Sequence, residues 1–231
     1  MTTMLIKIFR EVCSAVIDFL FPPRCPLCGE PTEKYGEWCG GCLKAAVFVR
    51  SISLPPLIDR VILLGRYRGG LRDIIHRVKY DGETERITYV QEFLIAAEKS
   101  LPPNFLPPAD LVIAVPVPLY PAKEKKRGFN QAELFFAEWL KKRGIKTVRL
   151  LKRKRATTAQ FGLTPTERRK NVADAFAAME NTAEIAEGKT ILLLDDIMTS
   201  GSTLTECAAC LKRAGVKTVW AMALSGDGQK R

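Results

Sequence analysis

Two adjacent carboxylates, Asp195 and Asp196, lie between a short apolar run and a turn rich in glycine and hydroxyl groups. The apolar run, residues 190–194, predicts a strand that is buried on both faces. The acids would then lie at its carboxyl end, where open α/β sheets bind ligands. The turn offers backbone N–H groups and hydroxyls at a helix N-terminus, which suit a phosphate. Its residues are Thr199, Ser200, Gly201, Ser202 and Thr203. This order of groups predicts a sugar-phosphate site, with the acids on hydroxyls or on a metal.

The alternative for this stretch is an ordinary strand, turn and helix, with the acids where the strand meets the turn and with no role in ligand binding. A P-loop is disfavoured, because no lysine follows Gly201 as that motif requires. The stretch resembles the binding motif of type I phosphoribosyltransferases, which use phosphoribosyl pyrophosphate (PRPP). The resemblance implies that Asp195 and Asp196 hold the ribose 2- and 3-hydroxyls, that the turn binds the 5-phosphate, and that Mg²⁺ accompanies PRPP.

A second candidate segment is a strand at 111–115 that runs into a loop fixed by prolines. The loop residues are Val117, Pro118, Leu119 and Tyr120. The cations that follow them are Lys123, Lys125, Lys126 and Arg127. A loop at the carboxyl end of a strand, backed by four cations, suits pyrophosphate, since arginine binds phosphate in a bidentate manner and lysine acts as a point charge. We predict that the loop and Arg127 bind the pyrophosphate of PRPP; a solvated basic loop is the alternative.

A third candidate segment is a run of four cations, Lys152, Arg153, Lys154 and Arg155. With Thr157 and Gln160 it resembles the mobile catalytic loop of glutamine-type amidophosphoribosyltransferases. The resemblance implies that Arg155 meets the leaving pyrophosphate, with Arg153 as a second candidate. Closure of such a loop would exclude water from the reaction centre. A simple charged surface is the alternative.

The positive charge of the chain is concentrated in one segment. The 231 residues carry 36 basic and 25 acidic side chains, a net charge of +11. Residues 123–170 hold 16 basic and 4 acidic side chains, whereas the remainder holds 20 and 21. A solvated surface is usually mixed in sign, so this block predicts a polyanionic partner: pyrophosphate, nucleic acid, or both. The predicted contacts to single-stranded DNA are Lys123, Lys125, Lys126, Lys152, Arg153, Lys154 and Arg155.

Two C-x2-C pairs predict a metal site. Their members are Cys25, Cys28, Cys39 and Cys42. This spacing is typical of four-thiolate zinc, and a structural zinc ion explains how a short segment with little apolar core folds. Disulfides are the alternative, but no secretory signal indicates an oxidising compartment. Cys207 and Cys210 form a third such pair on a predicted helix, where we expect both to pack in the core.

The N-terminal segment predicts an amphipathic helix. Apolar residues recur at helical spacing and are interrupted by Lys7, Arg10, Glu11 and Asp18. These charges break the apolar core that a signal peptide needs. No apolar run reaches about 18 residues, the length of a membrane span. We expect a cytoplasmic protein, with peripheral membrane contact through this helix as an alternative.

Strands and helices alternate in the rest of the chain. Strands are predicted at 61–64, 111–115, 147–151, 190–194 and 218–224. Helices are predicted at about 70–80, 86–100, 129–143 and 203–214. The third helix places Phe135, Phe136 and Trp139 at core spacing. This alternation predicts an α/β fold with a mostly parallel sheet covered by helices. The predicted organisation is a helix (1–22), a four-cysteine zinc module (23–50), a linker (51–57) and a phosphoribosyltransferase-like domain (58–231).

In chain order these motifs resemble the ComF family over nearly the whole length. They include the apolar N-terminal helix, the cysteine pairs, Lys-Tyr-Asp-Gly at 79–82, Arg-Gly-Phe-Asn-Gln at 127–131 and the acid and hydroxyl motif at 195–203. The resemblance implies a zinc-bearing, phosphoribosyltransferase-like protein linked to natural competence, the import of single-stranded DNA. No glutaminase domain is present, so a glutamine-dependent amidophosphoribosyltransferase is not expected.

These features are compatible with three functions. The first is a phosphoribosyltransferase of unknown acceptor, whose catalytic residues are Arg153, Arg155, Asp195 and Asp196. The second is a nucleic-acid-binding module that retains the fold and whose affinity falls steeply with salt. The third is a scaffold of the DNA-import machinery, whose zinc module docks a helicase or another competence protein. His76, the only histidine, lies outside these motifs and is predicted to be structural or incidental.

Overall fold

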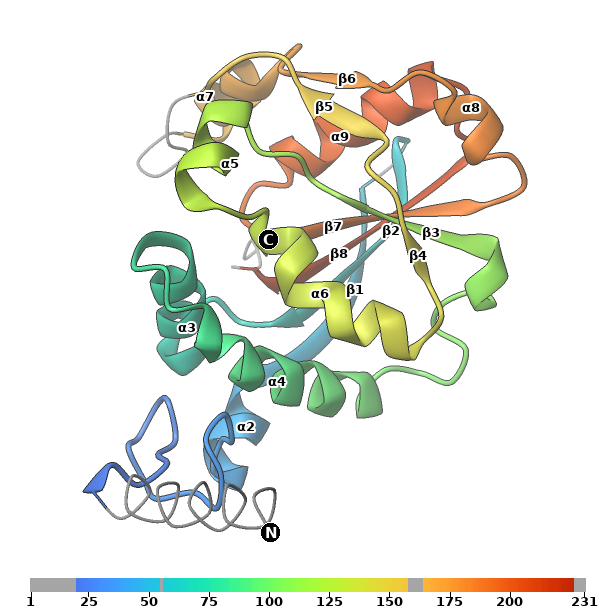
Figure 1. Ribbon diagram of the computed structural model, residues 1–231. Coiled ribbons are helices and arrows are strands. Elements are labelled where there is room, and N and C mark those ends of the chain that lie inside the picture. Colours follow the sequence, from blue (N-terminus) through green and yellow to red (C-terminus); the bar gives the residue numbers. More distant parts are fainter. Residues whose placement is uncertain (1–19, 55, 158–163, 227–231) are drawn as a thin grey trace, which may run out of the picture.

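A six-stranded sheet forms the centre of the molecule in the computed structural model, which describes residues 20–54, 56–157 and 164–226 (Figure 1). The strands are ordered β1-β2-β8-β7-β3-β4. Their bounds are Val47–Leu54 (β1), Ile58–Gly65 (β2), Val112–Pro116 (β3), Lys146–Thr147 (β4), Thr190–Met198 (β7) and Thr218–Gly226 (β8). β1 runs antiparallel to β2, and the other neighbours are parallel. The predicted, mostly parallel α/β fold is thereby confirmed.

Helices cover both faces of the sheet (Figure 1). One face carries α3 (Gly69–Tyr80), α4 (Ile87–Lys99) and α6 (Gln131–Lys142). The other carries α9 (Ser202–Arg213) and a two-stranded sheet of β5 (Leu151–Arg153) and β6 (Phe176–Ala178). The remaining described elements are α2 (Gly40–Ala46), η1 (Thr84–Arg86), η2 (Ala109–Leu111), α5 (Pro121–Arg127), α7 (Pro165–Val172) and α8 (Thr182–Ile185).

Strand β7 is buried on both faces because successive side chains enter different cores. Leu192 and Leu194 pack in the core that contains Phe135, Phe136 and Trp139 of α6. Ile191 and Leu193 pack in the core that contains Cys207 and Cys210 of α9. The core positions predicted for the α6 aromatics and the two cysteines are confirmed. β7 is therefore a rigid support for the residues at its carboxyl end.

Two expectations about the strands were wrong. Residues 51–54 belong to β1 and pair with β2, whereas a linker was predicted there; Val49 and Ile52 favour a strand at a sheet edge. The strand predicted at 147–151 is split, because β4 ends at Thr147 and β5 begins at Leu151 in the other sheet. Between them Arg149 turns outward to form ion pairs with Glu124 and Glu133.

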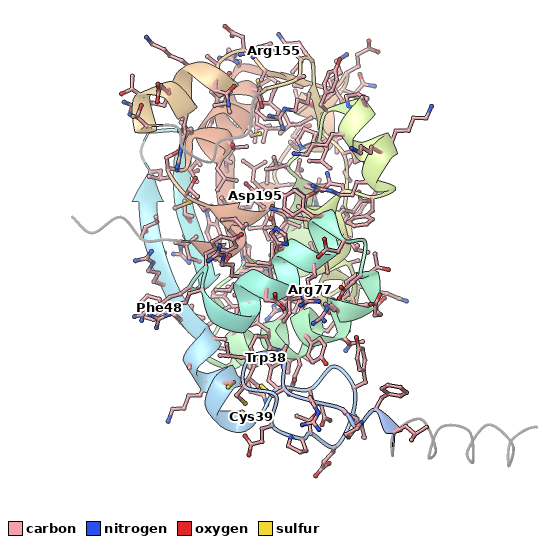
Figure 2. The ribbon with its side chains drawn as sticks, turned by 90° about the vertical axis from the view of Figure 1, so that its left-hand side faces the viewer. Trp38, Cys39, Phe48, Arg77, Arg155 and Asp195 are labelled. Carbon is pink, nitrogen blue, oxygen red and sulfur yellow. The ribbon has the colours of Figure 1, made fainter. Side chains whose placement is uncertain are left out.

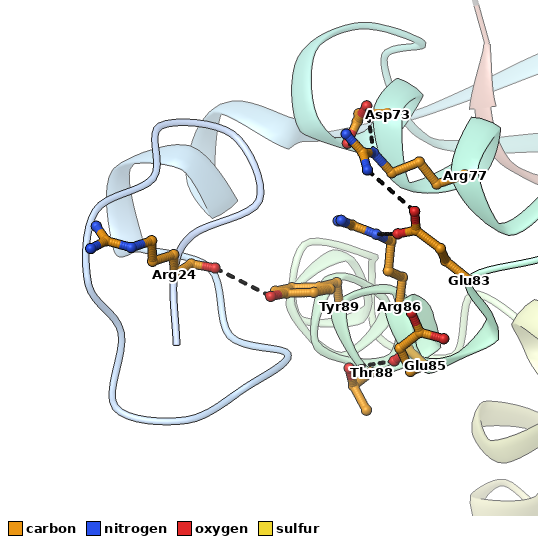
Figure 3. Close-up of polar contacts among 8 residues, drawn as sticks. All are labelled: Arg24, Asp73, Arg77, Glu83, Glu85, Arg86, Thr88 and Tyr89. Atoms are coloured by element: carbon orange, nitrogen blue, oxygen red, sulfur yellow. Dashed lines mark hydrogen bonds and ion pairs between the residues drawn. The ribbon is translucent and has the colours of Figure 1, made fainter. Parts of the chain in front are cut away.

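The four-cysteine segment docks on α3 and α4 through Trp38, which is only 4 % exposed. Its indole donates to the carbonyl of Tyr89 at 3.0 Å, and its backbone N–H donates to Glu92 at 2.6 Å. Figure 3 shows Tyr89 in turn donating to the carbonyl of Arg24, at 3.2 Å. Beside it, Asp73, Arg77, Glu83 and Arg86 form a chain of ion pairs that ties α3 to η1 (Figure 3).

The expected helix over 1–22 lies almost wholly outside the described residues. Gln160 of the third candidate segment also lies outside them. Among the helices in the described ranges, none is long and apolar enough to cross a membrane.

Candidate functional site

The paired acids lie within β7, because the strand continues past the predicted boundary to Met198. Asp196 is 3 % exposed and forms an ion pair with the ammonium of Lys79 from α3. Its other carboxylate oxygen accepts from the amide of Gln131, at 3.3 Å. Asp195 accepts from the backbone N–H of Asp196, at 2.9 Å, and lies in the middle of the molecule (Figure 2). Two carboxyl groups are thus held side by side, and among the described residues only Lys79 forms an ion pair with them.

This arrangement moves the pKa values of the two acids in opposite directions. Burial opposes ionisation of Asp196, but the ammonium of Lys79 and the hydrogen bonds around it lower the pKa of Asp196 below its usual value. Burial and the charge of Asp196 raise the pKa of Asp195 well above its usual value. Such a pair of environments is typical of functional sites, where one acid stays ionised and its neighbour resists ionisation.

The hydroxyl-rich turn joins β7 to α9 at Gly201. Gly201 has a φ of 74°, a left-handed conformation that favours glycine, and a Cβ there would lie 3.0 Å from Leu54. The hydroxyls of Ser200 and Ser202 lie 2.8 Å apart. A small pocket is lined by Asp195 together with the turn, including Thr199, Ser202 and Thr203. The acids and the predicted phosphate turn therefore share one site.

The motif at 127–131 forms the joint between the predicted pyrophosphate loop and α6. Gly128 ends α5 in a left-handed conformation, with a φ of 87°. Asn130 caps α6, accepting from the N–H groups of Ala132 and Glu133. Its amide donates to the carbonyl of Val117, at 2.9 Å. Gln131 bonds to both Arg127 and Asp196. Each polar member of the motif thus has a positioning contact that its spacing alone did not reveal.

The predicted pyrophosphate loop runs from the end of β3 to α5. The side chains of Val117 and Leu119 are buried, and the N–H of Val117 donates to Leu194 at 2.9 Å. Pro118 and Tyr120 are half-buried, and Tyr120 precedes the first residue of α5. The loop therefore lies beside the acids of β7, where its contribution to a ligand would come mainly from its backbone.

Four cations interact electrostatically with the acids: Lys79, Lys123, Arg127 and Arg153. Partial burial and the charges of Arg127, Lys79 and Arg153 lower the pKa of Lys123, although its side chain reaches the surface. Burial also lowers the pKa of Arg127, while Asp196 opposes this shift. Burial lowers the pKa of Arg153, and Asp195 opposes that shift. The cations repel one another, so the cluster is suited to a polyanion.

Arg153 and Arg155 are placed differently. Arg153 stacks on the ring of Phe176 and donates to the hydroxyl of Thr157. Arg155 is exposed and donates to the carbonyl of Ala173, at 2.5 Å, and it lies at the periphery, away from Asp195 (Figure 2). In this conformation Arg153 interacts electrostatically with Asp195, whereas Arg155 lies away from it.

The cations predicted to contact DNA lie on α5 and around β5, on the same side of the sheet (Figure 1). The members that are exposed are Lys123, Lys125, Lys126, Lys152, Lys154 and Arg155. Arg153 is half-buried and belongs to the acid site. The exposed cations on α5 and around β5 therefore lie on one side of the sheet.

The four cysteines of the N-terminal module converge. The Sγ atoms of Cys25, Cys28, Cys39 and Cys42 all lie within 4.8 Å of one another. Tetrahedral zinc with Zn–S bonds of about 2.3 Å requires sulfur atoms roughly 3.8 Å apart, and Cys28 and Cys39 are 3.6 Å apart. The donor set therefore fits a closed structural zinc site. In the same cluster, backbone hydrogen bonds outweigh burial and lower the pKa of Cys25 to about 6.

Proteins that are similar over most of the chain have names that refer to competence or to DNA utilization. "Competence protein F" of Haemophilus influenzae is 30 % identical over 208 residues, which cover 87 % of this chain and 84 % of the relative. The chain belongs to the ComF family. Another ComF relative, "Competence protein ComFC" of Bacillus subtilis, is 29 % identical and covers 83 % of this chain and 72 % of its own length. "DNA utilization protein YhgH" of Escherichia coli O6:H1 is 30 % identical over 203 residues, which cover 84 % of this chain and 80 % of the relative.

Two family models match parts of this ComF chain. The model described as "Double zinc ribbon domain" matches residues 16–53, and the one described as "Phosphoribosyl transferase domain" matches residues 132–231. The first match spans the four cysteines and ends within β1. The second contains β7, the acids and the hydroxyl-rich turn. The zinc-ribbon module and the phosphoribosyltransferase-type fold are therefore confirmed.

Sequence reasoning named Lys79 and Gln131 only as members of the family motifs and did not predict them as site residues. Both reach Asp196 from the face of the sheet that carries α3 and α6. Lys79 is the last cation of α3, and no local pattern marks it as a partner of β7. Asn130, in contrast, carried a readable signal, because asparagine before a helical pattern is a typical N-cap.

Proposed function

We propose that this protein binds PRPP together with Mg²⁺ at the carboxyl ends of β3 and β7, and that it acts in natural competence. The observation that carries the proposal is a pocket lined by Asp195 and the hydroxyl-rich N-terminus of α9, with the buried Asp196 bonded to Asp195 and with cations that interact electrostatically with both acids. The names of the relatives, which refer to competence and DNA utilization, support the biological setting.

Each group has a chemical role in this proposal. The turn at 199–203 binds the 5-phosphate through its N–H groups and hydroxyls, while Asp195 and Asp196 accept from the ribose hydroxyls. Arg127, Lys123 and the backbone of 117–120 bind the pyrophosphate. Mg²⁺, when bound, neutralises charge on the pyrophosphate, and the acids are the oxygen ligands that this chain offers to it.

If transfer occurs, the bond between the anomeric carbon and the pyrophosphate oxygen breaks and its electron pair leaves with pyrophosphate. An acceptor lone pair forms the new bond at that carbon. The developing charges lie on the ribose ring and on the leaving group, so positioned cations contribute most of the stabilisation. Arg153, which interacts electrostatically with Asp195, would do this, and Arg155 would need its loop to move.

A second activity, binding of single-stranded DNA, is favoured by the exposed cations on α5 and around β5. Except for Lys123, which the proposal also assigns to the pyrophosphate, these exposed residues have no role in the acid site. A DNA backbone could follow this surface while PRPP occupies the neighbouring site.

We further propose that the protein acts in the cytoplasm, since the described cysteines are free and thiols persist in reducing compartments. The zinc module would then dock a helicase or another competence protein.

Isothermal titration with Mg-PRPP tests the proposed site. We expect saturable binding to the wild-type protein and its loss in the Asp195→Asn/Asp196→Asn double variant. Asp110→Asn is the matched control, because Asp110 is exposed and removed from these contacts. Circular dichroism must show that each variant is folded. Absence of binding to the folded wild-type protein would sink the PRPP proposal and leave DNA binding as the working function.

A further inference from the structure

Lys79 engages one oxygen of the carboxylate that the proposed function assigns to the ribose. The side chains of Lys79 and Asp196 are 13 % and 4 % exposed, so water screens their ion pair only weakly. Gln131 engages the other oxygen. Both oxygens of Asp196 are thus bound by protein groups, and a ribose hydroxyl can reach this acid only in exchange for one of them.

The contacts of these two partners identify which one exchanges. Gln131 is the first residue of α6 and is held on its other side by Arg127. Lys79 lies in the last turn of α3, just before Gly82, whose φ of 73° turns the chain. A lysine ammonium stands on a flexible stem and carries three donors. Lys79 can therefore move its charge by rotating its side chain, whereas moving Gln131 would disturb Arg127 as well.

The surroundings of Lys79 identify where its charge can go. Its ammonium repels that of Lys123, and Arg127 repels Lys123 in the same way. Tyr80, the neighbour of Lys79, contacts the guanidinium of Arg127 at 5.8 Å from the ring centre. Lys79, Lys123 and Arg127 therefore surround a common region, and a polyanion placed there would turn their mutual repulsion into attraction.

We infer that Lys79 determines the specificity of the site for ligands that carry pyrophosphate. When ligand binds, the ribose hydroxyl replaces the ammonium on Asp196, and the ammonium moves to the pyrophosphate beside Lys123 and Arg127. The inference rests on the proposed function. A ligand without pyrophosphate, such as ribose 5-phosphate, would displace Lys79 without giving it a new partner, so PRPP is preferred.

The test compares binding of three probes by isothermal titration: Mg-PRPP, Mg-pyrophosphate and ribose 5-phosphate. In Lys79→Gln, affinity for PRPP and pyrophosphate should fall by about ten- to hundredfold, the usual effect of losing a hydrogen bond to a charged group. Affinity for ribose 5-phosphate should change far less. Lys99→Met, at the exposed end of α4, is the control and should match wild type.

Lys79→Arg keeps the positive charge and provides a second variant in case Lys79→Gln does not fold. It should retain the preference for PRPP over ribose 5-phosphate, and loss of that preference in the folded variant overturns the inference. An equal loss of affinity for PRPP and for ribose 5-phosphate in Lys79→Gln also overturns the inference, because Lys79 would then act only through Asp196. Tighter PRPP binding by Lys79→Gln would overturn it too, by identifying Lys79 as a competitor.

The failure of this inference and that of the proposed function are distinguishable. If wild type binds PRPP and the preference survives in Lys79→Gln, only the role of Lys79 is wrong. If folded wild type binds neither PRPP nor ribose 5-phosphate, both fail together.

Discussion

The carboxylate of Asp195 accepts a hydrogen bond from the backbone N–H of Asp196 at 2.9 Å. The first acid is therefore fixed by the peptide of the second, while the second is held by Lys79. The two neighbours therefore differ in their electrostatics. Asp196 is neutralised by a cation, whereas desolvation and the like charge of Asp196 oppose ionisation of Asp195 and raise its pKa.

Replacing each acid by asparagine should change stability in opposite directions at pH 7.5. A carboxyl with a raised folded pKa, as in Asp195, stabilises the fold below its unfolded pKa of about 3.9 and loses this contribution as pH rises. Asp195→Asn keeps the hydrogen-bond acceptor and should raise the melting temperature by about 2–4 °C, or roughly 1 kcal/mol for a protein of this size. Thermal unfolding at pH 7.5 and pH 4 should show this gain shrinking at the lower pH.

Asp196→Asn should instead destabilise the protein. The lowered pKa of Asp196 means that its contribution is present above the unfolded pKa and is lost as pH falls through the lower folded value. Removing one partner of a buried ion pair costs about 3–5 kcal/mol. Urea unfolding at pH 7.5 measures the loss, and a variant as stable as wild type would show that the pair with Lys79 contributes nothing.

Asn130 offers a way to separate helix capping from loop positioning. Asn130→Ala should cost about 1–2 kcal/mol for the lost cap and about 1 kcal/mol for the lost bond to Val117. Asn130→Asp retains the cap acceptor but cannot donate to the Val117 carbonyl. We expect Asn130→Asp to recover most of the stability in urea unfolding but not the affinity for PRPP. Recovery of both would show that the bond to Val117 does not position the loop.

The sequence predicted the parts of the site that are continuous along the chain. The apolar run before Asp195, the turn at 199–203 and the cysteine pairs are each local in the sequence, so their pattern was sufficient to predict the strand, the turn before α9 and the four-cysteine cluster. The helices α3, α4, α6 and α9 were predicted within one or two residues of their bounds, because apolar periodicity reports the buried face directly. The shorter helices α2, α5, α7 and α8 were not predicted. Trp139 and Cys207 were placed in the core for the same reason.

The remaining features depend on contacts between distant segments. The pairing of Lys79 with Asp196 joins a helix end to a strand end, and neither local sequence encodes the other. Arg149, between β4 and β5, pairs with Glu124 and Glu133, contacts that only the folded chain provides. Residues 51–54 read as a linker beside two prolines, yet pairing with β2 decides their structure.

The contact between Gly70 and Trp38 should control docking of the zinc module. A Cβ at Gly70 would lie 2.9 Å from the indole ring of Trp38 and 3.0 Å from Leu27. Gly70→Ala should therefore cost about 1–3 kcal/mol, the usual range for overpacking, and should increase protease cleavage within the module. Gly41→Ala is the control, since a Cβ at Gly41 would meet no atom within 4 Å. Equal behaviour of the two variants would mean that this contact does not hold the module.

The four-cysteine cluster should bind one zinc ion per chain. Cys39→Ser should lose the metal, as measured by elemental analysis, and should raise the exposure of Trp38 to fluorescence quenchers because the module is folded by its metal. Cys207→Ala, which removes a buried thiol outside the cluster, should keep the metal. A Cys39→Ser protein with full zinc content would contradict a site made by these four thiolates.

The exposed cations of α5 should set the affinity for single-stranded DNA. Lys125→Glu/Lys126→Glu should weaken binding of a fluorescent oligothymidylate and reduce the slope of log affinity against log salt by about 1.4, since each phosphate contact contributes about 0.7 for single strands. The matched control is Lys141→Glu/Lys142→Glu, which reverses two exposed cations of the same basic segment at the end of α6. α6 packs on the opposite face of the sheet from β5, so fluorescence anisotropy over a salt series can separate a local surface from net charge. If both double variants lose affinity equally, binding follows the overall charge of the chain, and the surface formed by α5 and β5 is not the DNA site.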